Sequence, residues 1–155
     1  MTWRSVFEAV VLPMVRRPRL FQVAALCHRQ GHAGPEVLLV TSRETGRWVL
    51  PKGWPVRGLD AAGAAVEEAW EEAGVRPAPG RPRPVGRYRY AKRLKGGLPV
   101  ETEVAVFAVA VAKLADTFPE VGSRERRWMT PAKAAEAVDE PDLKTLLRAL
   151  PPLAG

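Results

Sequence analysis

Residues 53–75 read GWPVRGLDAAGAAVEEAWEEAGV, and this stretch carries the strongest pattern in the chain. Its second half predicts a helix, because Asp60 is a favoured N-cap residue and alanine-rich turns follow it. Gly74 marks the helix end, since glycine readily adopts the left-handed conformation that follows a last helical turn. We therefore expect a helix between Asp60 and Val75, entered from the loop that begins at Gly53.

Three glutamates on this predicted helix form a candidate metal site. Glu68, Glu71 and Glu72 stand at positions i, i+3 and i+4, which places their carboxylates on one side of the helix. Unpaired carboxylates on one face repel each other unless cations bind between them. Hard divalent cations that prefer oxygen ligands, Mg²⁺ or Mn²⁺, are the natural partners of such a group.

The spacing from Gly53 to the run EAWEEAGV at residues 68–75 resembles the signature box of the Nudix hydrolases. Members of that family cleave a nucleoside diphosphate, or another diphosphate, linked to a second moiety. Its box reads Gly, five residues, Glu, seven residues, then Arg-Glu-aliphatic-any-Glu-Glu-any-Gly-aliphatic. The chain departs from it at Leu59, which replaces the first Glu, and at Glu67, which replaces the Arg. In the family this arginine orients the helix carboxylates, so we expect weaker metal binding or a shifted metal preference.

The resemblance implies an α/β fold, namely an α/β/α sandwich with a mixed β-sheet between helices. It also implies that Glu68 and Glu72 bind Mg²⁺ or Mn²⁺, helped by a backbone carbonyl near Lys52 or Gly53. Glu71 is then either a further metal ligand or the base that activates water.

Hydrolysis of a diphosphate needs charge neutralisation, a positioned water and a base for its proton. The family often takes such a base from a loop outside the box, and Glu120 is our catalytic candidate there, with Glu125, Glu101 and Glu103 as alternatives. Arginine forks suit phosphate oxygens, and the chain is rich in them near strand ends. The phosphate-binding candidates are Arg19, Ser42, Arg43, Lys52, Arg87, Arg89 and Lys92.

The rest of the sequence alternates between predicted strands and helices. We expect strands at residues 21–28, 36–41, 48–50, 85–92, 100–114 and 126–129, and helices at residues 132–138 and 142–150. Residues 76–84 contain four prolines and one glycine, which predicts a stiff connection. The middle of the strand at 100–114 is apolar on both faces, so it is expected to be a central strand.

The chain has 155 residues, and its length and composition predict one domain that is large enough to bury a hydrophobic core. We expect an N-terminal extension at 1–18, the main domain at 19–150 and a tail at 151–155. A single cysteine, Cys27, suits a reducing cytoplasm, and no apolar run is long enough to span a membrane. The net charge of +7 favours anionic partners such as polyphosphates, nucleotides or RNA.

Beyond the box, five further runs carry a second resemblance: QVAALC at 22–27, VLLVTSR at 37–43, RWVLP at 47–51, FPE at 118–120 and RRW at 126–128. With these runs, residues 19–150 resemble the branch that hydrolyses diphosphoinositol polyphosphates and diadenosine polyphosphates. Lys52 and Trp54 stand where that branch has glycines. The sequence therefore predicts a metal-dependent hydrolase of phosphoanhydride bonds, acting as a monomer or homodimer. One alternative is a pyrophosphohydrolase of nucleoside triphosphates or RNA 5′ ends, which a base stacked on Trp54 or Tyr88 would favour. The other is a catalytically weak nucleotide-binding regulator, which the two departures from the box keep open.

Overall fold

The computed structural model describes residues 20–93 and 97–153. Within these residues the chain forms an eight-stranded sheet and three helices. The elements are β1 (Leu20–Gly31), β2 (Gly34–Thr41), β3 (Trp48–Val49), β4 (Lys52–Gly53), α3 (Ala61–Ala73), β5 (Val75–Pro77), β6 (Arg83–Arg93), β7 (Pro99–Leu114), β8 (Arg126–Met129), α4 (Pro131–Ala137) and α5 (Pro141–Arg148). The expected extension at 1–18, the candidate Arg19 and residues 154–155 of the expected tail lie outside the described part.

The sheet is mixed, as expected. Its order is β3-β2-β1-β7-β5, and β4, β6 and β8 pair with β1, β7 and β2 respectively. β1 and β7 run parallel from Leu20–Thr102 to His28–Ala110, while the other pairings are antiparallel. β1 and β7 therefore form the centre of the sheet, which confirms the prediction that the apolar strand at 100–114 is central.

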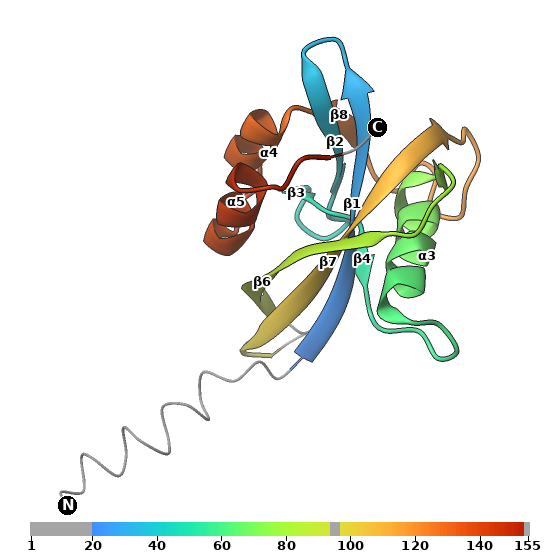
Figure 1. Ribbon diagram of the computed structural model, residues 1–155. Coiled ribbons are helices and arrows are strands. Elements are labelled where there is room, and N and C mark those ends of the chain that lie inside the picture. Colours follow the sequence, from blue (N-terminus) through green and yellow to red (C-terminus); the bar gives the residue numbers. More distant parts are fainter. Residues whose placement is uncertain (1–19, 94–96, 154–155) are drawn as a thin grey trace, which may run out of the picture.

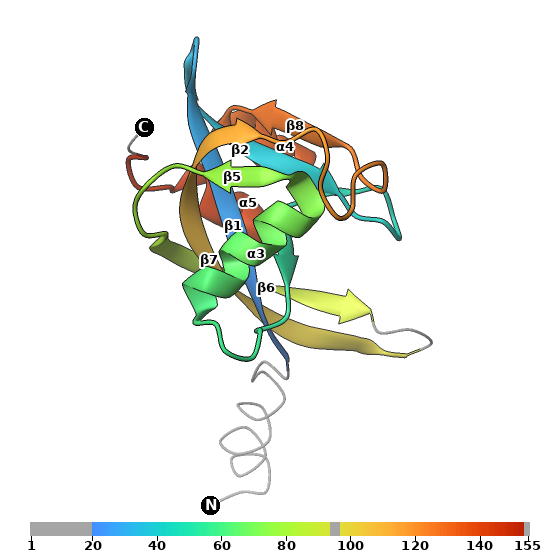
Figure 2. The ribbon, with the colours of Figure 1, turned by 90° about the vertical axis from the view of Figure 1, so that its right-hand side faces the viewer.

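Helices cover both faces of this sheet (Figure 1). α3 lies on one face, and α4 and α5 lie on the other; Figure 2 shows α3 across the front of the strands. Two apolar clusters fill the space between the layers. One packs Leu143 and Leu147 of α5 against sheet residues such as Leu26, and the other packs the alanines of α3 against Val23 and Leu38. The α/β/α sandwich is thus confirmed.

The side of α3 that faces the sheet consists of small residues. Ala65, Ala69 and Ala73, spaced four apart, are completely buried against the sheet. A stripe of alanines allows the helix to lie close to the strands, because no long side chain separates the two. The close approach places the glutamates on the flank of α3 beside β4, which immediately precedes the loop into the helix.

Two details of the strands differ from the sequence prediction. Val75, predicted at the end of the helix, and residues 76–77 of the predicted connection form β5 and pair with β7. The second detail is Val85, which strict alternation along β6 would place on the same side as Arg87 and Arg89. A register shift between Pro84 and Gly86 inserts one extra residue, and Val85 therefore packs on the same core cluster as Tyr88 and Tyr90.

Both ends of α3 follow the sequence prediction. Asp60 caps the first turn, where its Oδ1 accepts the Gly63 N–H at 2.7 Å. Gly74 closes the last turn with φ of 68°. A Cβ at Gly74 would lie 2.5 Å from Cδ1 of Phe118, so both the backbone angle and the packing require glycine.

Replacing Gly74 with alanine is therefore expected to lower the free energy of unfolding by about 1–2 kcal/mol from the left-handed conformation alone. The overlap with Phe118 adds to this loss. Gly46→Ala is a matched control, because Gly46 has φ of 70° but a Cβ added there would meet nothing within 4 Å. Chemical denaturation should show a larger loss for Gly74→Ala. Equal losses would mean that Phe118 moves aside at no cost.

Candidate active site

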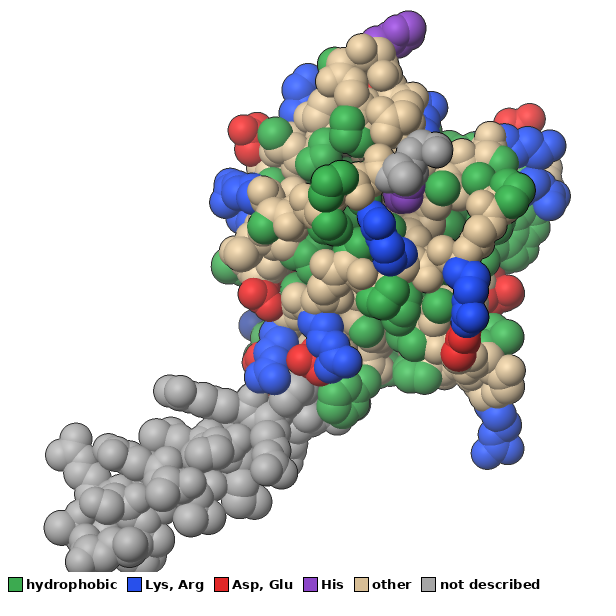
Figure 3. Space-filling view, viewed as in Figure 1, with side chains coloured by type: hydrophobic (Ala, Val, Ile, Leu, Met, Phe, Trp, Pro, Cys, Tyr) green, Lys and Arg blue, Asp and Glu red, His purple; other side chains and the backbone are tan. Residues whose placement is uncertain are grey.

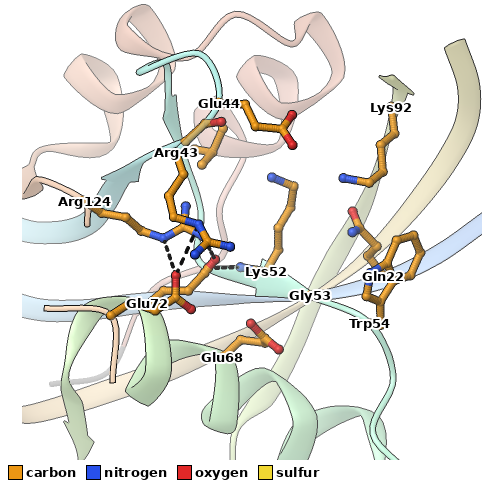
Figure 4. Close-up of a pocket in the computed structure, with 13 residues that line it drawn as sticks. Gln22, Arg43, Glu44, Lys52, Gly53, Trp54, Glu68, Glu72, Lys92 and Arg124 are labelled. Carbon is orange, nitrogen blue, oxygen red and sulfur yellow. Dashed lines mark hydrogen bonds and ion pairs between the residues drawn. The ribbon is translucent and has the colours of Figure 1, made fainter. Parts of the chain in front are cut away.

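A cavity of about 290 Å³ lies where β4, the flank of α3 and the loop before β8 meet (Figure 4). Seven of the predicted site residues line it: Ser42, Arg43, Lys52, Glu68, Glu72, Lys92 and Glu120. These residues come from five different parts of the sequence. The cavity contains both carboxylates and cations, which is the combination that a site for a metal and a phosphate requires.

Glu72 is the most buried of the cavity carboxylates, with only 4% of its surface exposed. Its Oε1 lies 3.1 Å from Nη2 of Arg124, and its Oε2 accepts the backbone N–H of Lys52 at 3.2 Å. A carboxylate has about four lone-pair sites, so two remain for other ligands. Burial raises the pKa of Glu72 to about 7 despite the neighbouring Arg124.

Glu68 lies directly against Gly53. A Cβ added at Gly53 would overlap the Glu68 carboxyl group, so the missing side chain leaves the space that this carboxylate occupies. Burial raises the pKa of Glu68 to about 7, and repulsion from Glu72, Glu71 and Glu120 adds to the shift. The carboxylates are therefore close enough to oppose each other's ionisation.

Arg124 connects the helix to the loop before β8. In addition to Glu72, it donates from Nε to Oε1 of Glu120 at 3.2 Å and from Nη1 to the carbonyl oxygen of Thr41 at 3.1 Å. Arg43 approaches the same Glu120 oxygen, with its Nε at 3.6 Å. These contacts hold Glu120, which lies far from the helix in sequence, beside Glu72.

Two lysines contribute positive charge on the other side of the cavity. Lys52 is half-buried, and its partial burial lowers its pKa although Glu72 and Glu140 act in the opposite direction. Lys92 lies with its Nζ 5.7 Å from the ring centroid of Trp54. Within the described part of the chain neither lysine forms an ion pair, so both are available to an anion.

Three predicted site residues do not line the cavity. Glu71 lies beside Glu67, and burial together with Glu67 raises its pKa. Arg87 and Arg89 contact Glu103 instead, at 3.1 Å and 3.6 Å. The helix rotation that buries the alanines explains the position of Glu71, because only the glutamates nearest β4 can point into the cavity.

Sequence reasoning did not select Arg124, Gln22 or Glu44, which also line the cavity. Gln22 could have been selected from the sequence, because it is the one polar residue in the apolar run at 21–27. Arg124 could also have been selected, because it stands four residues after the candidate base Glu120. Tyr88, considered above as a stacking surface for a base, is 2% exposed and packs in the core, so that interpretation is wrong.

The protein side chains supply only part of the ligand set that a Mg²⁺ ion needs. Within residues 20–93 and 97–153, no three His, Cys, Asp or Glu side chains form a ligand group. Mg²⁺ commonly binds through one or two carboxylates, with water and substrate phosphates completing its shell. Glu68, Glu72 and the neighbouring backbone of β4 match that pattern.

The raised pKa values of Glu68 and Glu72 predict how the metal-free protein responds to pH. A carboxyl whose folded pKa exceeds its unfolded value stabilises the fold at low pH, and this contribution is lost as pH rises through about 7. In EDTA we expect the melting temperature to be a few degrees lower at about pH 8 than at about pH 5.5. Adding Mg²⁺ should raise it more at the higher pH, because ligands bind metal when deprotonated.

His28 acts in the opposite direction, since burial lowers its pKa. Glu72→Gln isolates the carboxylate contribution, and it should flatten the pH dependence in EDTA. Differential scanning fluorimetry measures both effects. A melting temperature that rises from about pH 5.5 to about pH 8 in wild type and variant alike would contradict the prediction.

Comparison with known proteins gives one family. A family model described as NUDIX domain matches residues 18–150. Human diphosphoinositol polyphosphate phosphohydrolase 3-alpha is 38% identical over 60 residues, and the Bos taurus 3-beta protein has the same identity and length of match. Each match covers 39% of this chain and 37% of the relative, so the similarity spans well under half of either protein.

Solved structures show the same fold at low sequence identity. A C. elegans Ap4A hydrolase has a TM-score of 0.56 and 19% identity, covering 83% of this chain and 93% of that one. The NUDIX domain of Shewanella oneidensis NrtR, complexed with ADP ribose, has a TM-score of 0.60 and 18% identity over 94% and 95% of the two chains. A NUDIX hydrolase from Nitrosomonas europaea has a TM-score of 0.64 and 16% identity over 85% and 87%. Because the family model covers most of its length, the chain belongs to the NUDIX domain family.

Proposed function

We propose that this protein is a metal-dependent hydrolase of phosphoanhydride bonds in a diphosphate linked to another moiety. The observation that carries the proposal is the convergence of Glu68, Glu72 and Glu120 with lysine and arginine side chains in one cavity. Relatives named as diphosphoinositol polyphosphate phosphohydrolases and as an Ap4A hydrolase support phosphate-dense substrates of these two kinds.

The residues divide into three tasks. Glu68 and Glu72 would hold Mg²⁺ or Mn²⁺, which when bound neutralises charge on the phosphate oxygens. Lys52, Lys92 and Arg43 bind and orient the phosphates. A water oxygen then bonds to phosphorus, the bridging P–O bond breaks, and the proton of the water passes to a carboxylate.

We assign this base to Glu120 ahead of Glu71. Glu120 lines the cavity and is held there by Arg124 and Arg43, whereas Glu71 lies outside it beside Glu67. A base must lie within hydrogen-bond reach of the attacking water, directly or through one further water. A substitution that lowers kcat at Glu120 and leaves it nearly unchanged at Glu71 would support the assignment.

A non-catalytic regulator is the alternative from another class. Its sequence basis was Leu59 and Glu67, yet both side chains are exposed and neither lines the cavity. The substitutions therefore leave the cavity-lining carboxylates in place, which favours the enzyme.

RNA was the other partner considered. On the face shown in Figure 3, Lys and Arg side chains are interspersed with Asp and Glu rather than gathered into one stripe. A continuous basic track is typical of proteins that bind a nucleic acid backbone. The face shown therefore lacks the continuous basic track that a nucleic acid backbone would follow. No helix in the described part of the chain is both long and apolar enough to cross a membrane.

A phosphate-release screen tests the proposed function. Diadenosine polyphosphates, diphosphoinositol polyphosphates and nucleoside triphosphates are each supplied with Mg²⁺ or Mn²⁺, and EDTA removes the metal. We expect turnover that EDTA abolishes. Tight binding of these compounds without any turnover would favour the regulator instead.

A further inference from the structure

The C-terminal end of α3 is bound to the loop between β7 and β8, residues 115–125, which is orange in Figure 2. The carbonyl oxygen of Glu71 accepts the backbone N–H of Glu120 at 3.0 Å, and that of Gly74 accepts the N–H of Ala115 at 2.8 Å. The last carbonyl groups of a helix have no partner inside the helix, so they need donors from elsewhere. The loop that carries the candidate base Glu120 supplies such donors.

Arg126, the first residue of β8, joins the same two parts of the chain. Its Nη1 donates to the carbonyl oxygen of Ala73 at 2.7 Å and to that of Ala115 at 2.9 Å, so one nitrogen links the helix end to the start of the loop. Its guanidinium carbon lies 4.9 Å from the ring centroid of Phe118. α3 has no basic residue in its own last turn, so Arg126 also supplies the cation that a helix C-terminus favours.

The loop connects Phe118 rigidly to the candidate base. The carbonyl oxygen of Phe118 accepts the N–H of Val121 at 3.1 Å, and that of Glu120 accepts the N–H of Ser123 at 3.0 Å. Pro119 stands between them and has a fixed φ angle. Phe118 is 8% exposed, so it is anchored in place. A contact that holds Phe118 therefore also holds the backbone of Glu120.

These contacts determine how far the base lies from the metal-binding carboxylates. Glu68 and Glu72 stand on α3, whereas Glu120 stands on the loop. Arg124 and Arg43 hold the side chain of Glu120, and the end of α3 holds its backbone. A misplacement of about 1 Å can lower the rate of a catalysed step about 100-fold, even when its cause lies far from the reacting atoms.

We propose that Arg126 is a positioning residue, which sets the distance between the base Glu120 and the metal-binding carboxylates of α3. It acts through the two carbonyl groups that it joins and through Phe118, and it is not one of the residues that line the cavity. The proposal rests on the proposed function, because it takes Glu120 as the base of that reaction.

Arg126→Met tests this role, since methionine can still cover Phe118 but donates no hydrogen bond. We expect kcat to fall about 10- to 100-fold, while KM and Mn²⁺ affinity stay within about threefold, because the metal and phosphate ligands keep their places. Arg126→Lys retains a cation that can donate to the carbonyl groups, so it should recover part of kcat. Steady-state kinetics and Mn²⁺ titration measure these quantities.

Arg127→Met is the matched control, because it makes the same change at the next residue. Arg127 is exposed, lies 5.0 Å from the ring centroid of Trp48 and does not line the cavity. Its substitution should leave kcat within about twofold of wild type. A loss of kcat in Arg127→Met equal to that in Arg126→Met would overturn the proposal, because the effect would then not depend on the contacts of Arg126.

A double-mutant cycle with Glu120→Gln distinguishes positioning from a general loss of structure. If Arg126 acts through the base, Arg126→Met should lower kcat much less in the Glu120→Gln background than in wild type, because the displaced group no longer accepts a proton. The same fold loss in both backgrounds would overturn the proposal.

Hydrogen exchange at the Glu120 amide gives a readout that needs no turnover, since this N–H donates to the carbonyl oxygen of Glu71. Measured by NMR, the exchange should become at least about tenfold faster in Arg126→Met and stay unchanged in Arg127→Met. Faster exchange in a protein that hydrolyses no substrate would reject the hydrolase and support the placement of Glu120 by Arg126. Unchanged exchange would overturn this proposal and leave the hydrolase untouched.

Discussion

Replacing Glu72 with glutamine is expected to lower kcat at least about 100-fold, because even partners outside the first coordination shell commonly contribute 10- to 100-fold. Glutamine keeps the size of the side chain, and its single oxygen can still accept the Lys52 N–H. It has no negative charge to offer a divalent cation and no charge to pair with Arg124. The expected loss in kcat therefore comes from weaker metal binding and not from a change in the size of the side chain.

Two measurements separate this effect from a folding defect. Mn²⁺ titration followed by electron paramagnetic resonance reports metal affinity without substrate, and it should show at least about tenfold weaker binding. Glu136→Gln, at an exposed position on α4, is the control and should leave both quantities unchanged. Full activity of Glu72→Gln at saturating Mg²⁺ would remove Glu72 from the metal site.

Replacing Gly53 with alanine is expected to weaken metal binding about 10- to 100-fold with little change in stability. The new Cβ would overlap the Glu68 carboxyl group, which is the end of a flexible side chain and can move away. The backbone of Gly53 is not among the left-handed glycines, so alanine causes no backbone strain. We therefore expect Gly53→Ala to displace the Glu68 carboxyl group without lowering the stability of the fold.

The same Mn²⁺ titration, together with thermal melting, tests this prediction. Gly53→Ala should lose metal affinity while melting within a few degrees of wild type. Gly46→Ala, whose added Cβ meets nothing, should keep its metal affinity. If Gly53→Ala binds Mn²⁺ as tightly as wild type, the contact between Gly53 and Glu68 does not shape the metal site.

The sequence determined the helix α3, the central strand β7 and the family. Asp60 and Gly74 fixed the ends of α3, because capping and left-handed backbone geometry are local properties of a few residues. The apolar run in β7 likewise predicted a central strand, since a strand covered on both faces must be apolar on both. The spacing of Gly53 and the glutamates is itself a property of the sequence, and it was enough to indicate the NUDIX family.

The tertiary structure alone decided which charged side chains meet. Helical spacing placed Glu68, Glu71 and Glu72 on one side, but the burial of the alanine stripe turned Glu68 and Glu72 toward β4 and left Glu71 outside the cavity. The sequence predicted that Arg87 and Arg89 bind phosphate. The register of β6 and β7 instead places Glu103 beside both arginines.

The tertiary structure also decided that Arg124 and Gln22 line the cavity. Their partners, Glu72 and Tyr90, are 52 and 68 residues away in the sequence. Ion pairs and hydrogen bonds between side chains depend on distances of about 3 Å, which a pattern in one dimension does not encode. Local geometry therefore fixed the helix and the strands, whereas the composition of the cavity followed from how the layers pack.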